Sequence, residues 1–170
     1  MIKSRTLEKA ASMLSDKRDR EAVDIFTQRL YDNYADINLL EMWTNIDDRE
    51  RLVLVIDWER YLSEIMERAR LEDACARENP DYDESDRANH LCTTCGDDFA
   101  RAVRDIAEMI RATIRETNTT LRSWGSPLRL YEEDIELDTD PYEFFLYGDY
   151  DSDTLITIEK ERNNDICRSN

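Results

Sequence analysis

The spacing of the apolar residues changes abruptly at the segment Trp124-Gly125-Ser126-Pro127. Before this segment, apolar residues recur every three or four positions, which is the period of an amphipathic helix. After it, apolar and polar residues alternate, which is typical of strands. Gly and Pro at the point of change indicate a turn. The sequence therefore predicts an α+β fold, mainly α-helical with a small C-terminal antiparallel β-meander.

Three helical segments are expected within residues 4–76. The first is short and amphipathic, with a stripe at Leu7, Ala10, Ala11 and Leu14. The second has Asp19 as its expected N-cap, and its stripe comprises Ala22, Val23, Phe26, Leu30 and Tyr34. An apolar cluster over 39–43 fits a further short helix.

A long third helix is expected to begin at Asp47 or Asp48 and to run to residue 76. Its stripe comprises Leu52, Val55, Ile56, Leu62, Ile65, Met66 and Ala69. A polar loop over 77–93 follows, and then a helix over 94–121. The stripe of that helix comprises Phe99, Val103, Ile106, Ile110 and Ile114. We expect the two long helices to pack together, with Leu62 and Ile106 in the core.

Three strands are expected after the turn, from alternation near 128–137 and from aromatic and β-branched residues over 142–147 and 154–160. Gly148–Asp153 is the expected turn between the last two strands. Because so small a meander is not stable alone, it should pack on the helices or on a partner. The expected division is a helical domain over 1–124 and a β appendage over 125–170.

The chain carries 40 acidic and 23 basic side chains, a formal charge of −17. This balance argues against direct binding to nucleic acid or to an anionic membrane, because both attract basic surfaces. Arg greatly exceeds Lys, and Asp exceeds Glu, which favours a halophile or one of its viruses. A GC-rich genome combined with an acidic interaction surface explains the same composition. No signal peptide or membrane span is apparent, so the expected location is the cytoplasm or an assembled virus particle.

The motif Cys92-Thr93-Thr94-Cys95-Gly96 resembles a zinc knuckle, because two residues between thiolates let both sulfurs face one metal. With Cys75 and His90 it makes a Cys₃His set that would close the polar loop. Ordinary reduced thiols and a redox pair are the competing interpretations. Cys167 is expected to take no part.

Ten carboxylates and no Lys or Arg lie between Tyr131 and Asp153. The predicted acidic interaction patch comprises Glu132, Glu133, Asp134, Glu136, Asp138, Asp140, Asp149, Asp151 and Asp153. It fits a mimic of DNA phosphates, a cation site or a docking surface for a basic partner, whereas a charge run is most often only a solvated face. The Asp149, Asp151 and Asp153 spacing copies the start of a calcium loop, but Thr154 and Lys160 break the pattern.

No Walker A, G-x-S-x-G, H-E-x-x-H or dinucleotide-binding motif occurs, so no catalytic residues are predicted and an enzyme is not expected. The predicted function is a non-catalytic protein-protein interaction or assembly protein, with a basic protein partner or a second copy of itself. The alternatives are an acidic nucleic-acid mimic that inhibits a DNA-binding host protein and a small zinc-stabilised regulatory module.

Overall fold

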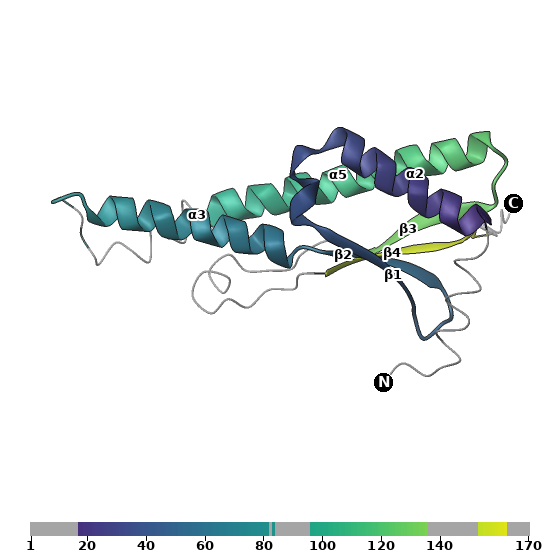
Figure 1. Ribbon diagram of the computed structural model, residues 1–170, viewed down its shortest axis with the longest axis horizontal. Coiled ribbons are helices and arrows are strands. Elements are labelled where there is room, and N and C mark those ends of the chain that lie inside the picture. The colour runs from purple at the N-terminus through teal and green to yellow at the C-terminus, as the bar shows by residue number, and fades with distance from the viewer. Residues whose placement is uncertain (1–16, 82, 84–95, 136–152, 163–170) are drawn as a thin grey trace, which may run out of the picture.

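The computed structural model describes residues 17–81, 83, 96–135 and 153–162 (Figure 1). Along the chain, the first elements are helix α2 (Lys17–Asn33), the 3₁₀ helix η1 (Ala35–Leu39) and strands β1 (Glu41–Ile46) and β2 (Leu52–Asp57). Helices α3 (Glu59–Arg77) and α5 (Gly96–Ser123) follow, and strands β3 (Leu128–Asp134) and β4 (Asp153–Lys160) complete the described part.

The four strands form one antiparallel sheet in the order β1-β2-β4-β3. A helix followed by a hairpin occurs twice, as α2-β1-β2 and as α5-β3-β4, and the second strands of the two hairpins pair at the centre. The α+β class and the antiparallel sheet are therefore confirmed. The C-terminal meander is wrong in detail, because β1 and β2 precede α3.

The helix expected from residue 47 or 48 onward is wrong in its first half, which forms a turn and strand β2 instead. Residues Leu52, Val53, Leu54, Val55 and Ile56 are all apolar and all buried. A helical stripe can be found in such a run, but so can a central strand covered on both faces. Asp47 accepts backbone hydrogen bonds, as expected of an N-cap, but it does so at the turn between β1 and β2. Its Oδ1 accepts hydrogen bonds from the N–H groups of Arg49 and Arg51, each at 3.0 Å.

Helices α2 and α5 match the expected stripes and lie together over one face of the sheet (Figure 1). Ala22, Phe26 and Leu30 of α2 are completely buried. Leu62 and Ile106 are both in the core, as expected, but the main helix partner of α5 is α2 rather than α3. The core between helices and sheet also contains Leu54, Ile56, Leu130, Ile156 and Ile158. The sheet joins strands from both sides of residue 124, and the expected division into 1–124 and 125–170 stays a prediction.

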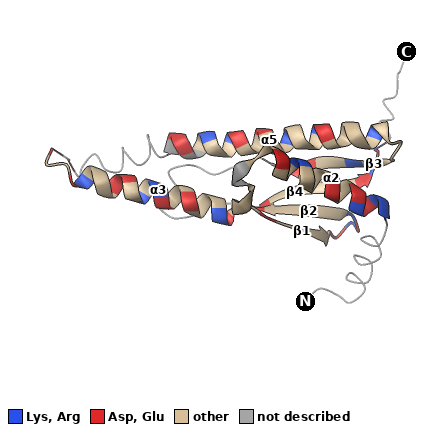
Figure 2. Ribbon diagram, turned by 45° about the horizontal axis from the view of Figure 1, so that its top comes forward, with Lys and Arg blue, Asp and Glu red and all other residues tan. Residues whose placement is uncertain are grey.

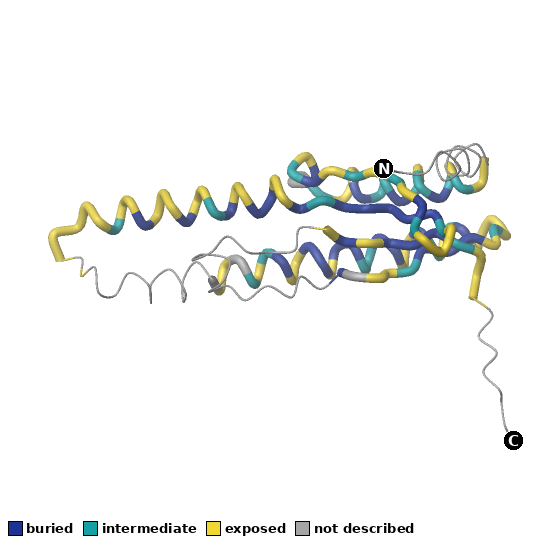
Figure 3. The backbone as a smooth tube through the Cα atoms, turned by 90° about the horizontal axis from the view of Figure 1, so that it is seen from below, coloured by how far each residue is buried: buried dark blue, intermediate teal, exposed yellow. Residues whose placement is uncertain are grey.

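Helix α3 leaves the end of the sheet and projects beyond the N-terminal end of α5 (Figure 1). Its buried residues, Tyr61, Leu62, Ile65, Ala69 and Asp73, follow a narrow stripe, and exposed residues dominate towards its far end (Figure 3). Leu71, on the other side of the helix, is 57% exposed.

The expected turn after α5 is confirmed, with Gly125 at φ +69°, a backbone conformation that glycine adopts readily. Two of the expected C-terminal strands correspond to β3 and β4, whereas 142–147 lies outside the described residues. Within the described residues, no helix is both long and apolar enough to cross a bilayer.

Candidate functional site

The predicted zinc ligands fall mainly outside the part of the chain that the structure describes. Cys75 is a free, exposed cysteine near the C-terminal end of α3. His90, Cys92 and Cys95 lie in the segment 84–95, which is not described. Among the described residues, no three His, Cys, Asp or Glu side chains are grouped as metal ligands. The Cys₃His site therefore stays a prediction.

The acidic interaction patch is described only at its two ends. Glu132 forms an ion pair with Arg111 of α5 at 3.2 Å. Glu133 forms ion pairs with Arg51 and Arg162, both at 3.1 Å. Glu136, Asp138, Asp140, Asp149 and Asp151 lie outside the described residues. Two of the predicted patch carboxylates are thus neutralised by arginines of the same chain.

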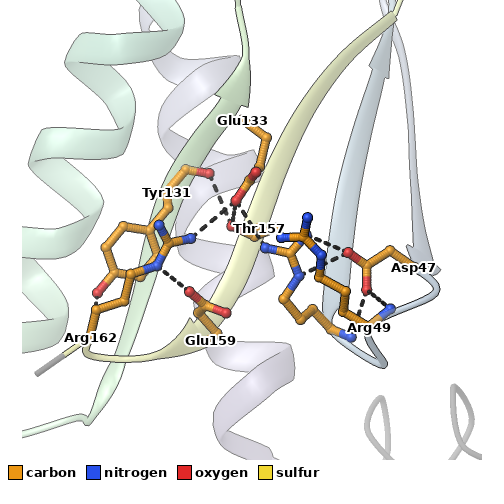
Figure 4. Close-up of polar contacts among 8 residues, drawn as sticks. Asp47, Arg49, Tyr131, Glu133, Thr157, Glu159 and Arg162 are labelled. Carbon is orange, nitrogen blue, oxygen red and sulfur yellow. Dashed lines mark hydrogen bonds and ion pairs between the residues drawn. The ribbon is translucent and has the colours of Figure 1, made fainter.

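Glu133 is the centre of a polar network on the sheet face opposite the helices (Figure 4). Its Oε1 accepts hydrogen bonds from Arg51 Nη1, Arg162 Nη2 and Thr157 Oγ1, the last at 3.0 Å. Arg162 also donates to Glu159, and its guanidinium lies 4.2 Å from the centroid of the Tyr131 ring. The network connects the β1–β2 turn, β3, β4 and the residues just after β4.

Arg51 connects this network to the first hairpin. Its Nε donates to Asp47 Oδ2 at 2.8 Å. Burial alone would raise the pKa of Asp47, but the hydrogen bonds and charge of Arg51 outweigh burial and hold that pKa below its ordinary value. The hydrogen bond to Asp47 in turn raises the pKa of Arg51. Asp47 and Arg51 therefore both stay charged at neutral pH.

The pKa of Glu133 is lowered in the same way. Its partial burial would raise the pKa, but the hydrogen bonds from Thr157 and Arg162 and the charge of Arg51 have the larger combined effect. Its carboxylate is already engaged by three donors. We interpret the network as a structural link between the two hairpins.

The net negative charge is not spread evenly over the chain. Acidic and basic residues are interspersed along α3 and α5 (Figure 2). Acidic and basic residues are equal in number in α2 and in α5, and α3 has one excess acid. The segments 78–95 and 136–152, in contrast, together contain ten more acidic than basic residues. A surface adapted to salt throughout would carry its excess on the helices too. This chain concentrates it in the segment before α5 and in the segment between β3 and β4.

A groove with an apolar floor lies between η1, α3 and α5. Its main chamber has a volume of about 510 Å³, and its apolar floor is formed by Tyr34, Ile37, Leu40, Tyr61, Ile106 and Met109. A smaller hollow of about 190 Å³ continues along α3 and α5, past Ile65 and Ala69. Ala102 lines both hollows, so they form one groove.

The rim of the groove is charged and slightly acidic. Glu72, Asp98 and Asp105 face Arg68 and Arg101 around it. Arg101 and Asp98 form an exposed ion pair at 3.3 Å. The described lining contains no Ser, Thr, Cys or His, so it provides apolar contact and ion pairing. The volume of the groove is within the range that ligand sites commonly have.

Neither the groove nor the network was predicted from the sequence. The apolar residues that line the groove belong to the same helical stripes as residues of the core. No local sequence pattern distinguishes groove residues from core residues. The partners in the polar network are far apart in the sequence, since Arg51 and Glu133 are 82 residues apart. The only local signal was the Asp47–Arg51 spacing, which is also typical of a helix start.

Comparison of the chain with protein-family models, curated proteins and solved structures finds no match. What the structure itself describes is a small α+β fold with an apolar groove between η1, α3 and α5.

Proposed function

We propose that this chain is a non-catalytic protein-interaction protein that holds an amphipathic, basic segment of a partner in the groove between α3 and α5. The observation that carries the proposal is the groove itself. It joins an apolar floor to a rim of three carboxylates and two guanidinium groups. An apolar ridge on the partner would be buried against the floor, and helices commonly dock in this way.

The distribution of charge supports a basic partner. The acidic segment 78–95 leads directly into α5, and the first turns of α5 contribute Asp98, Arg101 and Asp105 to the groove. Opposite charge near a docking site speeds association and selects the partner more than it adds affinity. Apolar burial in the groove would supply most of the binding free energy.

The test uses three synthetic helical peptides. The first has Leu at helical spacing with Lys elsewhere, the second replaces Lys by Glu, and the third replaces Leu by Ser. Only the Leu/Lys peptide should bind with measurable affinity by fluorescence anisotropy. Equal binding of the Ser/Lys peptide would show that charge alone attracts it, and would contradict the proposal.

A pair of matched variants tests the place of binding. Ala102 lines the groove, whereas Ala112 lies on the same helix, is half-buried and does not line it. Ala102→Trp should weaken binding of the Leu/Lys peptide by about tenfold or more, which is ~1.4 kcal/mol, and Ala112→Trp should not. Equal affinities of the two variants would place binding elsewhere.

The nucleic-acid mimic makes a different prediction. A mimic would bind a DNA-binding protein and would be displaced by DNA, with a steep dependence on salt. Ala102→Trp would not change the affinity of such a mimic for the DNA-binding protein. The mimic function would rest on segment 136–152, because Glu132 and Glu133 are paired within the chain.

A further inference from the structure

The two edges of the described sheet differ in how they are protected. Edge strand β3 carries the exposed residues Glu132 and Glu133, and a bulge interrupts its register between Glu132 and Asp134. Charges and bulges of this kind prevent a sheet edge from pairing with another chain. Edge strand β1 has one charged residue, Glu41, at its start, no proline, and an uninterrupted register with β2.

The backbone of β1 offers hydrogen-bonding groups at this edge. Asp47 donates its N–H to the carbonyl of Arg51 at 3.1 Å, just beyond the end of the strand pair. In an antiparallel ladder, successive residues alternate between facing the neighbouring strand and facing away from it. Met42 and Thr44 therefore turn their N–H and C=O groups away from β2, towards the edge, whereas the N–H of Ile46 donates to Asn45 Oδ1 at 2.8 Å.

A row of apolar side chains on the face opposite the helices leads to the same edge. The register places Trp43 beside Val55, and Val55 beside Leu155. Trp43 is 42% exposed and Leu155 is 37% exposed, whereas Val55 between them is buried. Exposed Trp at a sheet edge is characteristic of interaction surfaces.

We propose that two copies of this chain associate through β1, in antiparallel orientation, with Trp43 opposite Trp43 of the second copy. The two sheets would then form one continuous sheet of twice the strand number, with the helices of both copies on the same face. Residues directly opposite each other have their side chains on the same face of the sheet. If a two-fold axis is to keep both helical layers on one face, odd-numbered residues must therefore lie opposite odd-numbered residues, and even-numbered opposite even-numbered. Pairing centred on any single residue meets this condition, and residues 43 and 44 are the two at the middle of β1.

Charge selects between these two registers. Centring on Thr44 would place Glu41 opposite Asp47 of the second copy, and like charges directly opposite are destabilising. Centring on Trp43 places Glu41 opposite Asn45 and Met42 opposite Thr44. The outward backbone groups of Met42 and Thr44 can then bond one another. Trp43 then lies opposite Trp43 of the second copy in a non-hydrogen-bonded residue pair, the kind of pair in which side chains approach most closely.

A charge-swap experiment tests this arrangement by sedimentation of the full chain. The unmodified protein should dimerise, and more tightly at higher NaCl, because each copy has a formal charge of −17 and salt screens their repulsion. Trp43→Glu and Trp43→Lys alone should each weaken dimerisation by about tenfold or more. An equimolar mixture of the two variants should recover association, because opposite charges then face each other.

Trp124 supplies the matched control, since it is 61% exposed and lies in the turn between α5 and β3. Trp124→Glu and Trp124→Lys should leave the dimer unchanged, and circular dichroism should show all four variants folded. A monomeric unmodified protein at about 100 µM and high salt would overturn the proposal. Weakening by both Trp43 variants without recovery in the mixture would overturn it too, because Trp43 would then not face its own counterpart.

Discussion

Arg51 donates a hydrogen bond to Glu133 over a distance of 3.1 Å, although strand β4 lies between the strands that these residues adjoin. Arg51 immediately precedes β2, and Glu133 belongs to β3. Their side chains meet above β4, where Thr157 also donates to Glu133. This ion pair fastens the first hairpin to the second on the face that the helices leave uncovered (Figure 4).

Replacing Glu133 by Gln should lower the free energy of unfolding by roughly 1–2 kcal/mol, because Arg51 and Arg162 both lose a charged acceptor. Urea unfolding at neutral pH measures the change. Glu132→Gln is the matched control, since Glu132 has a more exposed side chain and one ion pair, with Arg111. Its cost should be smaller, and equal costs would contradict the central place of Glu133.

The network should also make stability fall in acid. The pKa values of Asp47 and Glu133 are lower in the folded chain than their ordinary values of 3.8 and 4.5. Their contribution is therefore fully present above those ordinary values and is lost as the pH falls through the folded values. Thermal midpoints recorded from neutral pH into acid should decline in that window, and less steeply in the Glu133→Gln variant. A parallel decline would show that Glu133 does not contribute.

Shortening a core side chain should lower the free energy of unfolding strongly at the two residues that the helical stripes place at the centre of the core. Leu62 is fully buried and Ile106 is 8% exposed. Leu62→Ala or Ile106→Ala should cost about 2–5 kcal/mol, because each removes apolar contact and leaves a cavity. Leu71→Ala on the exposed side of α3 should have little effect. Unchanged unfolding midpoints in both core variants would contradict the packing.

Zinc binding by Cys75, His90, Cys92 and Cys95 stays a prediction that elemental analysis can decide. The purified chain should carry about one zinc ion, as a Cys₃His set requires. Acidification should release the metal, because thiolates and imidazole must be deprotonated to bind it. Cys92→Ser should lose zinc and make the segment 77–93 more sensitive to protease, whereas Cys167→Ser should do neither. Metal-free protein purified without chelator would exclude the site.

The two helices whose stripes separate apolar from polar residues were predicted closely. Phe26 and Leu30 in α2, and Ile110 and Ile114 in α5, are buried as their spacing requires. The strand Leu52–Asp57 was missed, because its apolar residues are consecutive and satisfy either period. The candidate groove was missed as well, since its floor joins residues of η1, α3 and α5 that no local pattern connects.

By itself, the sequence determined the α+β class, the positions of α2 and α5, and the turn at Gly125. These depend on interactions within a few residues of each other, namely helical periodicity and the conformational freedom of glycine. Only the tertiary structure decided that β2 is the strand that joins the two hairpins. Val53 and Val55 face one side of the sheet while Leu52, Leu54 and Ile56 face the core on the other. Their burial needs neighbours from distant parts of the chain: α2 and α5 cover the core side, and β4 places Thr157 and Leu155 beside Val53 and Val55.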